Sequence, residues 1–414
     1  ALAQELAFGT IRNQLLYDRV IEIGSGRKVS SIDRSSLLLL RLGAHQLLSM
    51  RIPSHAAINE TVNLAKIIVN VGAGGFVNGI LRRVSERNRV EWIEFLTQQN
   101  TDPIDKLALE YSHPAWVIRA LQQALKIDGR EAEIESLLAA DNQAPLVNLA
   151  LMPGKTADTS DFVVGQASPI GYLMREGDPG KLVQVRDGQM RVQDQGSQLS
   201  ALLLSRARAA RVGELWLDLC AGPGGKAAVL AAEAKLAGAH FFANEVAPHR
   251  AKLVRQALSK IDPDVEISVA DGRSFGFEYS GKFDRIMLDA PCTGLGALRR
   301  RPEARWRKQP KDVAELTALQ QELIESAWGA LREGGILAYV TCSPHSAETV
   351  SIVDWLIRKY GSEVQLLDAG EVLSSLNPEL KLNRNRKTVQ LWPQVHETDA
   401  MFMALLGKQE TRTR

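Results

Sequence analysis

From Leu215 onward, the sequence alternates between short runs of strand-forming residues and longer runs with helical spacing. The run LWLDLC at residues 215–220 precedes GGKAAVLAAEAK, and FDRIMLDA at residues 283–290 precedes a long helical run that ends before GILAYVTC. Such alternation is typical of an α/β domain with a mostly parallel sheet. Because ligands bind at the carboxyl ends of the strands in open α/β sheets, functional residues are expected where these strands end.

The rest of the chain predicts two further domains. Residues 1–142 carry apolar residues at helical spacing, as in SSLLLLRLGAHQLLSM, and predict an all-α bundle. The runs PLVNLALMP, FVVGQ and KLVQVRD are short and strand-like, and they predict a small α+β domain over residues 143–190. The α/β domain is then expected to span residues 191–408, with DQGSQLSALLLSRARAA as its first helix.

Composition narrows the class of protein. No apolar run reaches the roughly 20 residues that a membrane span needs, and no signal-peptide pattern opens the chain. Three cysteines in 414 residues favour a reducing, cytoplasmic location over a disulfide framework. Neither the cysteines nor the histidines show the spacing of metal ligands, so no metal is expected.

Two clusters of basic residues stand out against a formal net charge of only +2. They are RRRPEARWRK at residues 299–308 and NRNRK at residues 383–387. Basic residues around an aromatic side chain suit phosphate contact and base stacking, although a solvated loop explains a basic run equally well. The candidate nucleic-acid contacts are Arg82, Arg83, Arg299, Arg300, Arg301, Arg305 and Trp306.

The stretch LDLCAGPGGK at residues 217–226 predicts a strand, a tight loop and a helix. Its glycines would let a ligand approach the backbone and the first amides of the helix. Nucleoside triphosphate binding is disfavoured, because Ala227 stands where a phosphate-binding loop needs Ser or Thr. Glu245 and Asp271 follow the next two strands, where acids can bind a ribose and an adenine amino group. Together these features predict a nucleoside-type cofactor, although each acid alone could be a helix cap.

Cys292 and Cys342 follow LDAP and YVT, at the ends of two strands of the same predicted sheet. A lone buried cysteine is usually structural, and this is the expectation for Cys220 in the glycine loop. A nucleophilic thiolate needs a pKa below about 8.5, and the basic residues after Cys292 could lower it. Asp289 adds a carboxylate near Cys292.

These groups fit methyl transfer to carbon 5 of cytosine. Addition of a thiolate at carbon 6 makes carbon 5 nucleophilic towards the methyl group of S-adenosylmethionine. A carboxyl group can hold or protonate ring nitrogen 3, and a second group must help remove the carbon 5 proton. Sequence spacing leaves open which of the two cysteines is the nucleophile.

Four motifs resemble the signature motifs of RNA 5-methylcytosine methyltransferases of the Fmu/Sun family: DLCAGPGGK, VQDQGSQLSALLL, LDAPCTGLGALRRRPEARW and YVTCSPHSAE. The tract RIPSHAAINETVNLAKIIVNVGAGGFVNGILRRV is similar to NusB, an all-α RNA-binding fold. A NusB-like domain followed by an Fmu-like catalytic domain is the arrangement of the bacterial 16S ribosomal RNA methyltransferases of the RsmB type. The resemblance implies a Rossmann-like class I methyltransferase domain after the helical bundle and the small α+β domain.

The resemblance also implies roles for single residues. It makes Cys342 the nucleophile, Cys292 the residue that helps resolve the covalent adduct, and Asp289 a contact of the cytosine near the methyl donor. It assigns S-adenosylmethionine binding to Cys220, Ala221, Gly222, Pro223, Gly224, Gly225, Lys226, Glu245, Arg250, Asp271 and Asp289. Gly222, Glu245 and Ala227 depart from the commoner Ala, Asp and Thr of the family. The expected partner is RNA, either 16S ribosomal RNA or a small-subunit assembly intermediate. Binding to DNA or to a membrane is not expected. The protein is expected to be a monomer.

Two other classes of function compete with this one. A non-catalytic NusB-like scaffold would be expected to lose a cysteine or the glycine loop, whereas this chain keeps both. A small-molecule or DNA methyltransferase fits less well with the T-C-S motif and the basic N-terminal helix. Within the family, transfer RNA is the alternative substrate, since ribosomal RNA is favoured only through the NusB-like fusion.

Overall fold

The structure is a computed structural model that describes residues 2–98 and 102–410. The chain divides into two compact units. Unit 1 comprises Ala1–Gln122 together with Arg301–Arg307, and unit 2 comprises Gln123–Arg300 and Lys308–Arg414. The domain limits drawn from the sequence at residues 142 and 190 remain a prediction. None of the helices in the described ranges is both long and apolar enough to cross a membrane.

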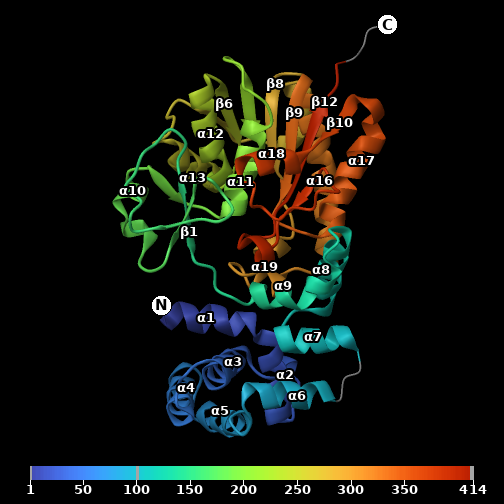
Figure 1. Cartoon of the computed structure of the whole chain (residues 1–414). Helices are drawn as coiled ribbons and strands as arrows, with labels where there is room; N and C mark the ends of the chain where they lie inside the picture. Colours follow the sequence, from blue (N-terminus) through green and yellow to red (C-terminus); the bar gives the residue numbers. More distant parts are fainter. Residues whose placement is uncertain (1, 99–101, 411–414) are drawn as a thin grey trace. The chain divides into compact units, whose positions relative to one another are not determined.

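Unit 1 is helical, as predicted (blue to cyan in Figure 1). Its helices are α1 (Leu2–Arg12), α2 (Gln14–Ser25), α3 (Arg34–Ser49), α4 (Ser54–Ile68), α5 (Val71–Val84), α6 (Arg89–Gln98), α7 (Pro103–Tyr111) and the first part of α8 (Ala115–Ile127). Side-chain caps explain two of the helix starts, because Asp33 accepts a hydrogen bond from Ser36 N at 2.9 Å and Asn70 accepts one from Ala73 N at 2.8 Å. The core includes Tyr17, Leu40 and Trp92.

The short helix α15 (Ala304–Arg307) also belongs to unit 1. Arg305 is fully buried and donates hydrogen bonds to the carbonyl oxygens of Arg12, at 3.3 Å, and Ser112, at 3.2 Å. The indole of Trp306 donates to Ile11 O at 2.8 Å. The prediction that Arg305 contacts RNA is therefore wrong, because its guanidinium caps backbone carbonyls inside the unit. Arg82 and Arg83 are exposed, and their RNA contact stays a prediction.

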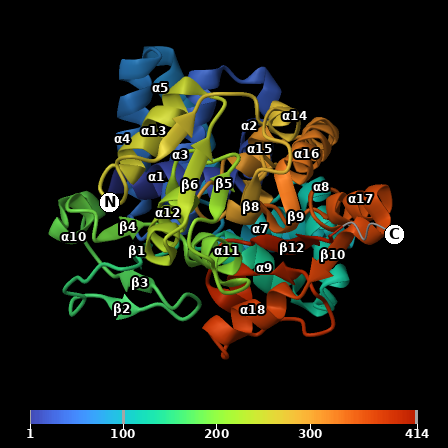
Figure 2. The ribbon, with the colours of Figure 1, turned by 90° about the horizontal axis from the view of Figure 1, so that it is seen from above.

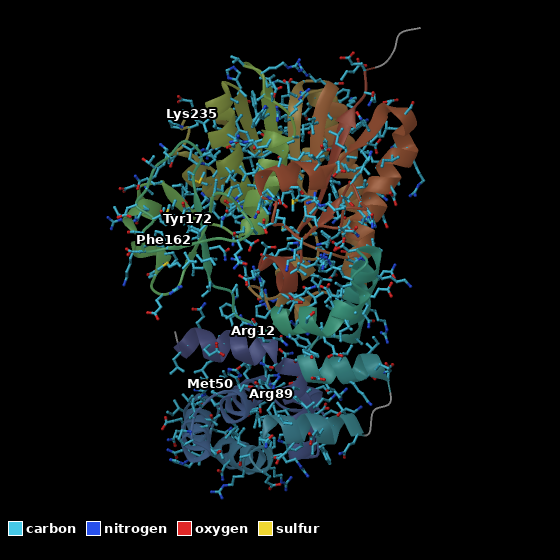
Figure 3. All side chains as sticks on the ribbon, viewed as in Figure 1. Arg12, Met50, Arg89, Phe162, Tyr172 and Lys235 are labelled. Carbon is cyan, nitrogen blue, oxygen red and sulfur yellow. The ribbon has the colours of Figure 1, made fainter. Side chains whose placement is uncertain are left out.

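Unit 2 contains a small antiparallel sheet in the order β2-β3-β1-β4. Its strands are β1 (Val147–Leu151), β2 (Val163–Val164), β3 (Gly171–Met174) and β4 (Met190–Val192). The run KLVQVRD, predicted as a strand, instead forms the helical turn α10 (Val183–Arg186). Leu182 and Val185 both pack on the cluster of Leu149, Met174 and Met190, which residues three apart do in a helical turn but not in a strand. Phe162 and Tyr172, labelled in Figure 3, pack on the same cluster.

The large sheet of unit 2 has the order β10-β12-β9-β8-β5-β6-β7, with β11 paired to β12. Its strands are β5 (Leu215–Asp218), β6 (His240–Asn244), β7 (Glu266–Ser268), β8 (Phe283–Asp289), β9 (Leu331–Thr341), β10 (Val364–Leu367), β11 (Val389–Gln390) and β12 (Phe402–Lys408). The five strands from β7 to β9 are parallel, whereas β12 pairs antiparallel with β9 and β10. The order reverses between β5 and β8, which is where a ligand crevice is expected.

Helices cover both faces of this sheet (Figure 2). One face packs on α11 (Gln195–Arg206), α12 (Gly225–Ala237), α13 (Pro248–Leu258) and α18 (Ala369–Leu376). The other packs on α14 (Phe275–Glu278), α16 (Pro310–Ala330) and α17 (Val350–Tyr360). Alternate residues of each strand enter opposite cores: Met287 lies in the first, and Ile286 and Leu288 in the second. Two short helices, α9 (Ile134–Asp141) and α19 (Pro393–His396), pack together in the same unit.

Candidate active site

The two strand-end cysteines meet at the carboxyl ends of β8 and β9. These strands are parallel neighbours, and their register places Asp289 opposite Val340. Cys292 follows Asp289 by three residues and Cys342 follows Val340 by two, so the two loops leave the sheet side by side. The sulfur of Cys292 lies 3.4 Å from that of Cys342. The sequence predicted only that both cysteines follow strands of one sheet, and the pairing of β8 with β9 makes them neighbours.

Backbone hydrogen bonds hold the Cys292 loop against the Cys342 loop. Gly296 N donates to Cys342 O at 2.9 Å, and Ala400 N donates to Gly296 O at 2.8 Å. A Cβ atom at position 296 would stand 2.0 Å from Ala400 O and 2.8 Å from Cys342 O. The approach of the three segments therefore requires glycine at this position.

The thiol of Cys292 lies in a buried environment next to Cys342 and two carboxylates. Its hydrogen-bond contact with Cys342, its burial and the negative charges of Glu348 and Asp289 raise the pKa of Cys292 well above the usual range. A raised pKa favours the protonated form of the Cys292 thiol at neutral pH.

The basic residues after Cys292 do not lower its pKa, contrary to the expectation from sequence. Arg299 donates to Asp399 at 3.1 Å and to Asp194 at 3.1 Å, and Arg300 is paired with the same two carboxylates. Arg299 is buried and Arg300 is partly buried. The predicted RNA contact of Arg299 is therefore wrong, because its guanidinium is enclosed in an ion-pair network. Arg301 is exposed, and its RNA contact remains a prediction.

A lysine supplies the positive charge of the site instead. Lys226, at the start of α12, places Nζ 2.8 Å from Asp289 Oδ2 and 3.4 Å from Ser197 Oγ. Burial alone would lower the pKa of Lys226, but Asp289 raises it to above the ordinary value, and Cys342 adds to this effect. Lys226 is therefore a buried cation that interacts with the predicted cytosine-binding acid and with the predicted nucleophile.

Glu245 and Arg250 shape the glycine loop. Glu245 is buried, and it accepts hydrogen bonds from Gly222 N and Ala247 N, both at 3.0 Å. Arg250 donates to Gly222 O and lies 3.4 Å from Glu245. A Cβ atom at position 222 would stand 2.1 Å from Glu245 Oε2, so the short residue at 222 accommodates the long acid at 245.

Two predicted cofactor residues have other partners. Asp271 caps the turn that follows β7 and is paired with Arg273 at 2.6 Å, which lowers the pKa of Asp271. Burial and the nearby carboxylates of Asp218, Asp289 and Glu245 raise the pKa of Cys220, which disfavours a thiolate there. The ligand contacts of Asp271 and Cys220 remain predictions.

Comparison with known proteins places this chain in a family. Residues 207–407 match the family described as 16S rRNA methyltransferase RsmB/F, and residues 1–86 match the NusB family. A Mycobacterium tuberculosis protein named as a methyltransferase is 44% identical, over 99% of this chain and 88% of that protein. The ribosomal RNA small subunit methyltransferase B of Serratia proteamaculans is 31% identical, over 99% of this chain and 90% of that protein. The chain belongs to the RsmB/F family of RNA methyltransferases.

Solved structures show the same fold. The crystal structure of PH0851 superposes with a TM-score of 0.80 at 22% identity, covering 98% of this chain and 90% of that one. NSun6 from Pyrococcus horikoshii gives a TM-score of 0.56 at 18% identity, covering 71% of this chain and 98% of that one. The helical N-terminal unit and the class I methyltransferase sheet predicted from the sequence are confirmed.

The cofactor of this RsmB/F family member is S-adenosylmethionine, and the residues around its glycine loop suit that ligand. Asp218, at the end of β5, is 1% exposed, and neither carboxylate oxygen has a hydrogen-bond partner of ordinary geometry within the described chain. Burial and the charge of Asp289 raise the pKa of Asp218 to about 8. A ligand that brings ammonium and sulfonium charges would relieve this accumulation of carboxylates. Sequence reasoning missed Asp218, although it lies within the glycine-loop motif.

Glu348 is the other residue that sequence reasoning missed. It is fully buried, and its carboxylate accepts hydrogen bonds from residues in both cysteine loops. Its position six residues after Cys342, within the YVTCSPHSAE stretch, could have identified it from the sequence.

Proposed function

We propose that this chain methylates carbon 5 of a specific cytosine in 16S ribosomal RNA, through a covalent bond between Cys342 and carbon 6 of that base. The observation that carries the proposal is the 3.4 Å separation of the Cys292 and Cys342 sulfurs beside the ion pair of Lys226 and Asp289. The choice of ribosomal RNA is supported by relatives named ribosomal RNA small subunit methyltransferase B and by the NusB-family match at residues 1–86.

The roles of the two cysteines follow from their environments. Cys342 provides the thiolate that bonds to carbon 6, because Lys226 lies near it and because Cys292 retains its own proton. S-adenosylmethionine supplies the electrophilic methyl group that carbon 5 then accepts. The carbon 5 proton must next leave to a base, after which the electrons of the carbon 5–hydrogen bond restore the ring double bond and the sulfur–carbon 6 bond breaks. The thiol of Cys292 can donate a hydrogen bond to the departing thiolate of Cys342.

Asp289 and Lys226 act on the base. The Asp289 carboxylate is held by Lys226 Nζ, and about a quarter of its side chain is exposed, at 26%. It therefore has acceptor capacity left for the ring-nitrogen 3 and amino edge of a cytosine. The base must leave its helical stack to reach these groups, which costs a few kcal/mol and favours a weakly paired target.

Methyl transfer to unmodified small-subunit RNA tests this function, with labelled S-adenosylmethionine and a denaturing gel for protein–RNA adducts. We expect label at cytosine carbon 5 with the wild type, neither label nor adduct with Cys342→Ala, and a trapped adduct with Cys292→Ala. An adduct trapped by Cys342→Ala would reverse the two roles. Transfer to transfer RNA but not to small-subunit RNA would refute the substrate assignment, and RNA binding without transfer would indicate a scaffold.

A further inference from the structure

One buried carboxylate joins the two cysteine loops. Thr293, which follows Cys292, donates to Glu348 through its backbone N–H at 2.7 Å and through its hydroxyl at 2.5 Å. Ser343, which follows Cys342, donates its hydroxyl to Glu348 at 2.6 Å. The hydroxyl oxygens of Thr293 and Ser343 lie 3.0 Å apart, and Gln320 Nε2 lies 3.3 Å from Glu348.

Burying the Glu348 carboxylate in this way costs free energy. Glu348 is 0% exposed, and within the described part of the chain its hydrogen-bond partners are neutral hydroxyl and amide groups rather than a cation. Burying a carboxylate without a cation costs several kcal/mol, which several short hydrogen bonds only offset. A neutral, apolar contact would close the same loops at less cost, so the charge and the acceptor geometry need another explanation.

We propose that Glu348 is a positioning residue that sets the separation of the Cys292 and Cys342 sulfurs for resolution of the covalent adduct. Because Thr293 and Ser343 are each one peptide bond from a cysteine, anchoring both to one carboxylate fixes the two loops in register. The proposal rests on the proposed function, since it concerns a step of that reaction.

The charge of Glu348 has a second consequence. The groups that raise the pKa of the Cys292 thiol are Cys342, burial, Glu348 and Asp289, while Lys226 is the cation that interacts with the neighbouring Cys342. Glu348 therefore helps to keep the proton on Cys292 while Cys342 reacts. A group that only filled space would not influence that proton.

Thiol alkylation of the free, full-length protein tests whether Glu348 influences the proton of Cys292. Iodoacetamide labelling of Cys292 and Cys342 is followed from pH 6 to about pH 10 by mass spectrometry of their peptides, for the wild type and for Glu348→Gln. We expect Cys292 to react at lower pH in Glu348→Gln, by about tenfold in rate for each unit by which its pKa falls. An unchanged profile for Cys292 in a folded variant overturns the inferred control of the Cys292 proton by Glu348.

Adduct turnover tests the positioning role. We expect Glu348→Gln and the milder Ser343→Ala, which removes one donor, to accumulate adduct because release slows more than formation. Glu348→Asp, which keeps the charge, should recover part of the release rate. Ser205→Ala is the matched control. It removes a buried serine hydroxyl whose one hydrogen bond among the described residues goes to Leu202 O in its own helix, at 3.2 Å, and it should leave the adduct fraction unchanged.

The alkylation and adduct experiments together distinguish failure of this proposal from failure of the proposed function. If formation and release slow equally in Glu348→Gln and Ser343→Ala, with only a lower melting temperature, Glu348 is merely structural and the positioning role is overturned. If the wild type forms no adduct at all, the proposed function fails, and the alkylation profile still decides whether Glu348 controls the Cys292 thiol.

Discussion

The sulfur of Cys292 lies 3.4 Å from the sulfur of Cys342, although the two residues are fifty positions apart in the chain. Parallel pairing of β8 with β9 brings them together, and the bond from Gly296 N to Cys342 O holds their loops. Two thiols this close can exchange a proton. They can also be oxidised to a disulfide.

We therefore expect the thiol oxidant diamide to convert Cys292 and Cys342 into a disulfide that abolishes methyl transfer and that dithiothreitol reverses. Intact mass should fall by two hydrogens, and one of the three free thiols, that of Cys220, should remain titratable. Cys292→Ala should not form the bond. If three thiols persist in oxidised wild type, the loops do not hold the sulfurs in reach of each other.

The ion pair of Lys226 and Asp289 predicts non-additive mutations. Lys226→Met should lower the free energy of unfolding by up to about 3 kcal/mol, because it leaves a largely buried carboxylate without its cation. Adding Asp289→Asn should restore most of that stability while methyl transfer stays absent. Urea titration of the two single variants and the double variant measures the coupling, and simple additivity would show that the two side chains act independently.

The contact between Gly222 and Glu245 predicts a compensating pair of substitutions. Gly222→Ala should weaken S-adenosylmethionine binding at least tenfold, about 1.4 kcal/mol, because the new Cβ would displace Glu245 and with it the loop. Adding Glu245→Asp shortens the acid and should recover part of the affinity. Isothermal titration calorimetry measures both. Normal binding by Gly222→Ala alone would mean that the loop adjusts freely.

Asp218 predicts a stability that decreases as the pH rises. Its pKa is raised to about 8 in the folded protein, against 3.8 as the ordinary value, so the folded state holds the proton more tightly than the unfolded chain. The contribution is complete below about pH 4 and is lost as the pH rises through 8, by up to about 1.4 kcal/mol for each pH unit. Urea titrations at pH 5 to pH 9 should show this slope in the wild type and a flatter one in Asp218→Asn. Equal slopes would indicate that Asp218 ionises normally.

Arg299 and Arg301 should differ in effect despite being close neighbours. Arg299→Met should cost about 3–5 kcal/mol of stability, because it leaves Asp194 and Asp399 buried with less compensation. Arg301→Ala, at an exposed site, should stay within about 0.5 kcal/mol of the wild type. Thermal unfolding together with RNA-binding titrations distinguishes the roles. Weaker RNA binding by Arg299→Met at full stability would contradict the structural role given to Arg299.

Some features of this protein follow from its sequence, and others follow only from its tertiary structure. Local residue patterns determined three features: apolar periodicity the helical N-terminal region, strand–helix alternation the parallel sheet, and the glycines of LDLCAGPGGK the loop. These features depend on local spacing and on which faces are buried. The strand ends then indicated Cys292, Cys342, Asp289 and Glu245 as candidates. The strand predicted for KLVQVRD is wrong. Leu182 and Val185 both pack on one apolar cluster, and this tertiary contact favours a helical turn over a strand.

Tertiary structure alone decided which charges act on which groups. Arg299 and Arg300, near Cys292 in sequence, are paired with Asp194 and Asp399, whereas Lys226, remote in sequence, is paired with Asp289. Glu348 acquired its partners only when β8 and β9 brought Thr293 and Ser343 to one place. Electrostatic interaction depends on distance and burial in space, and neither can be read from the order of residues along the chain.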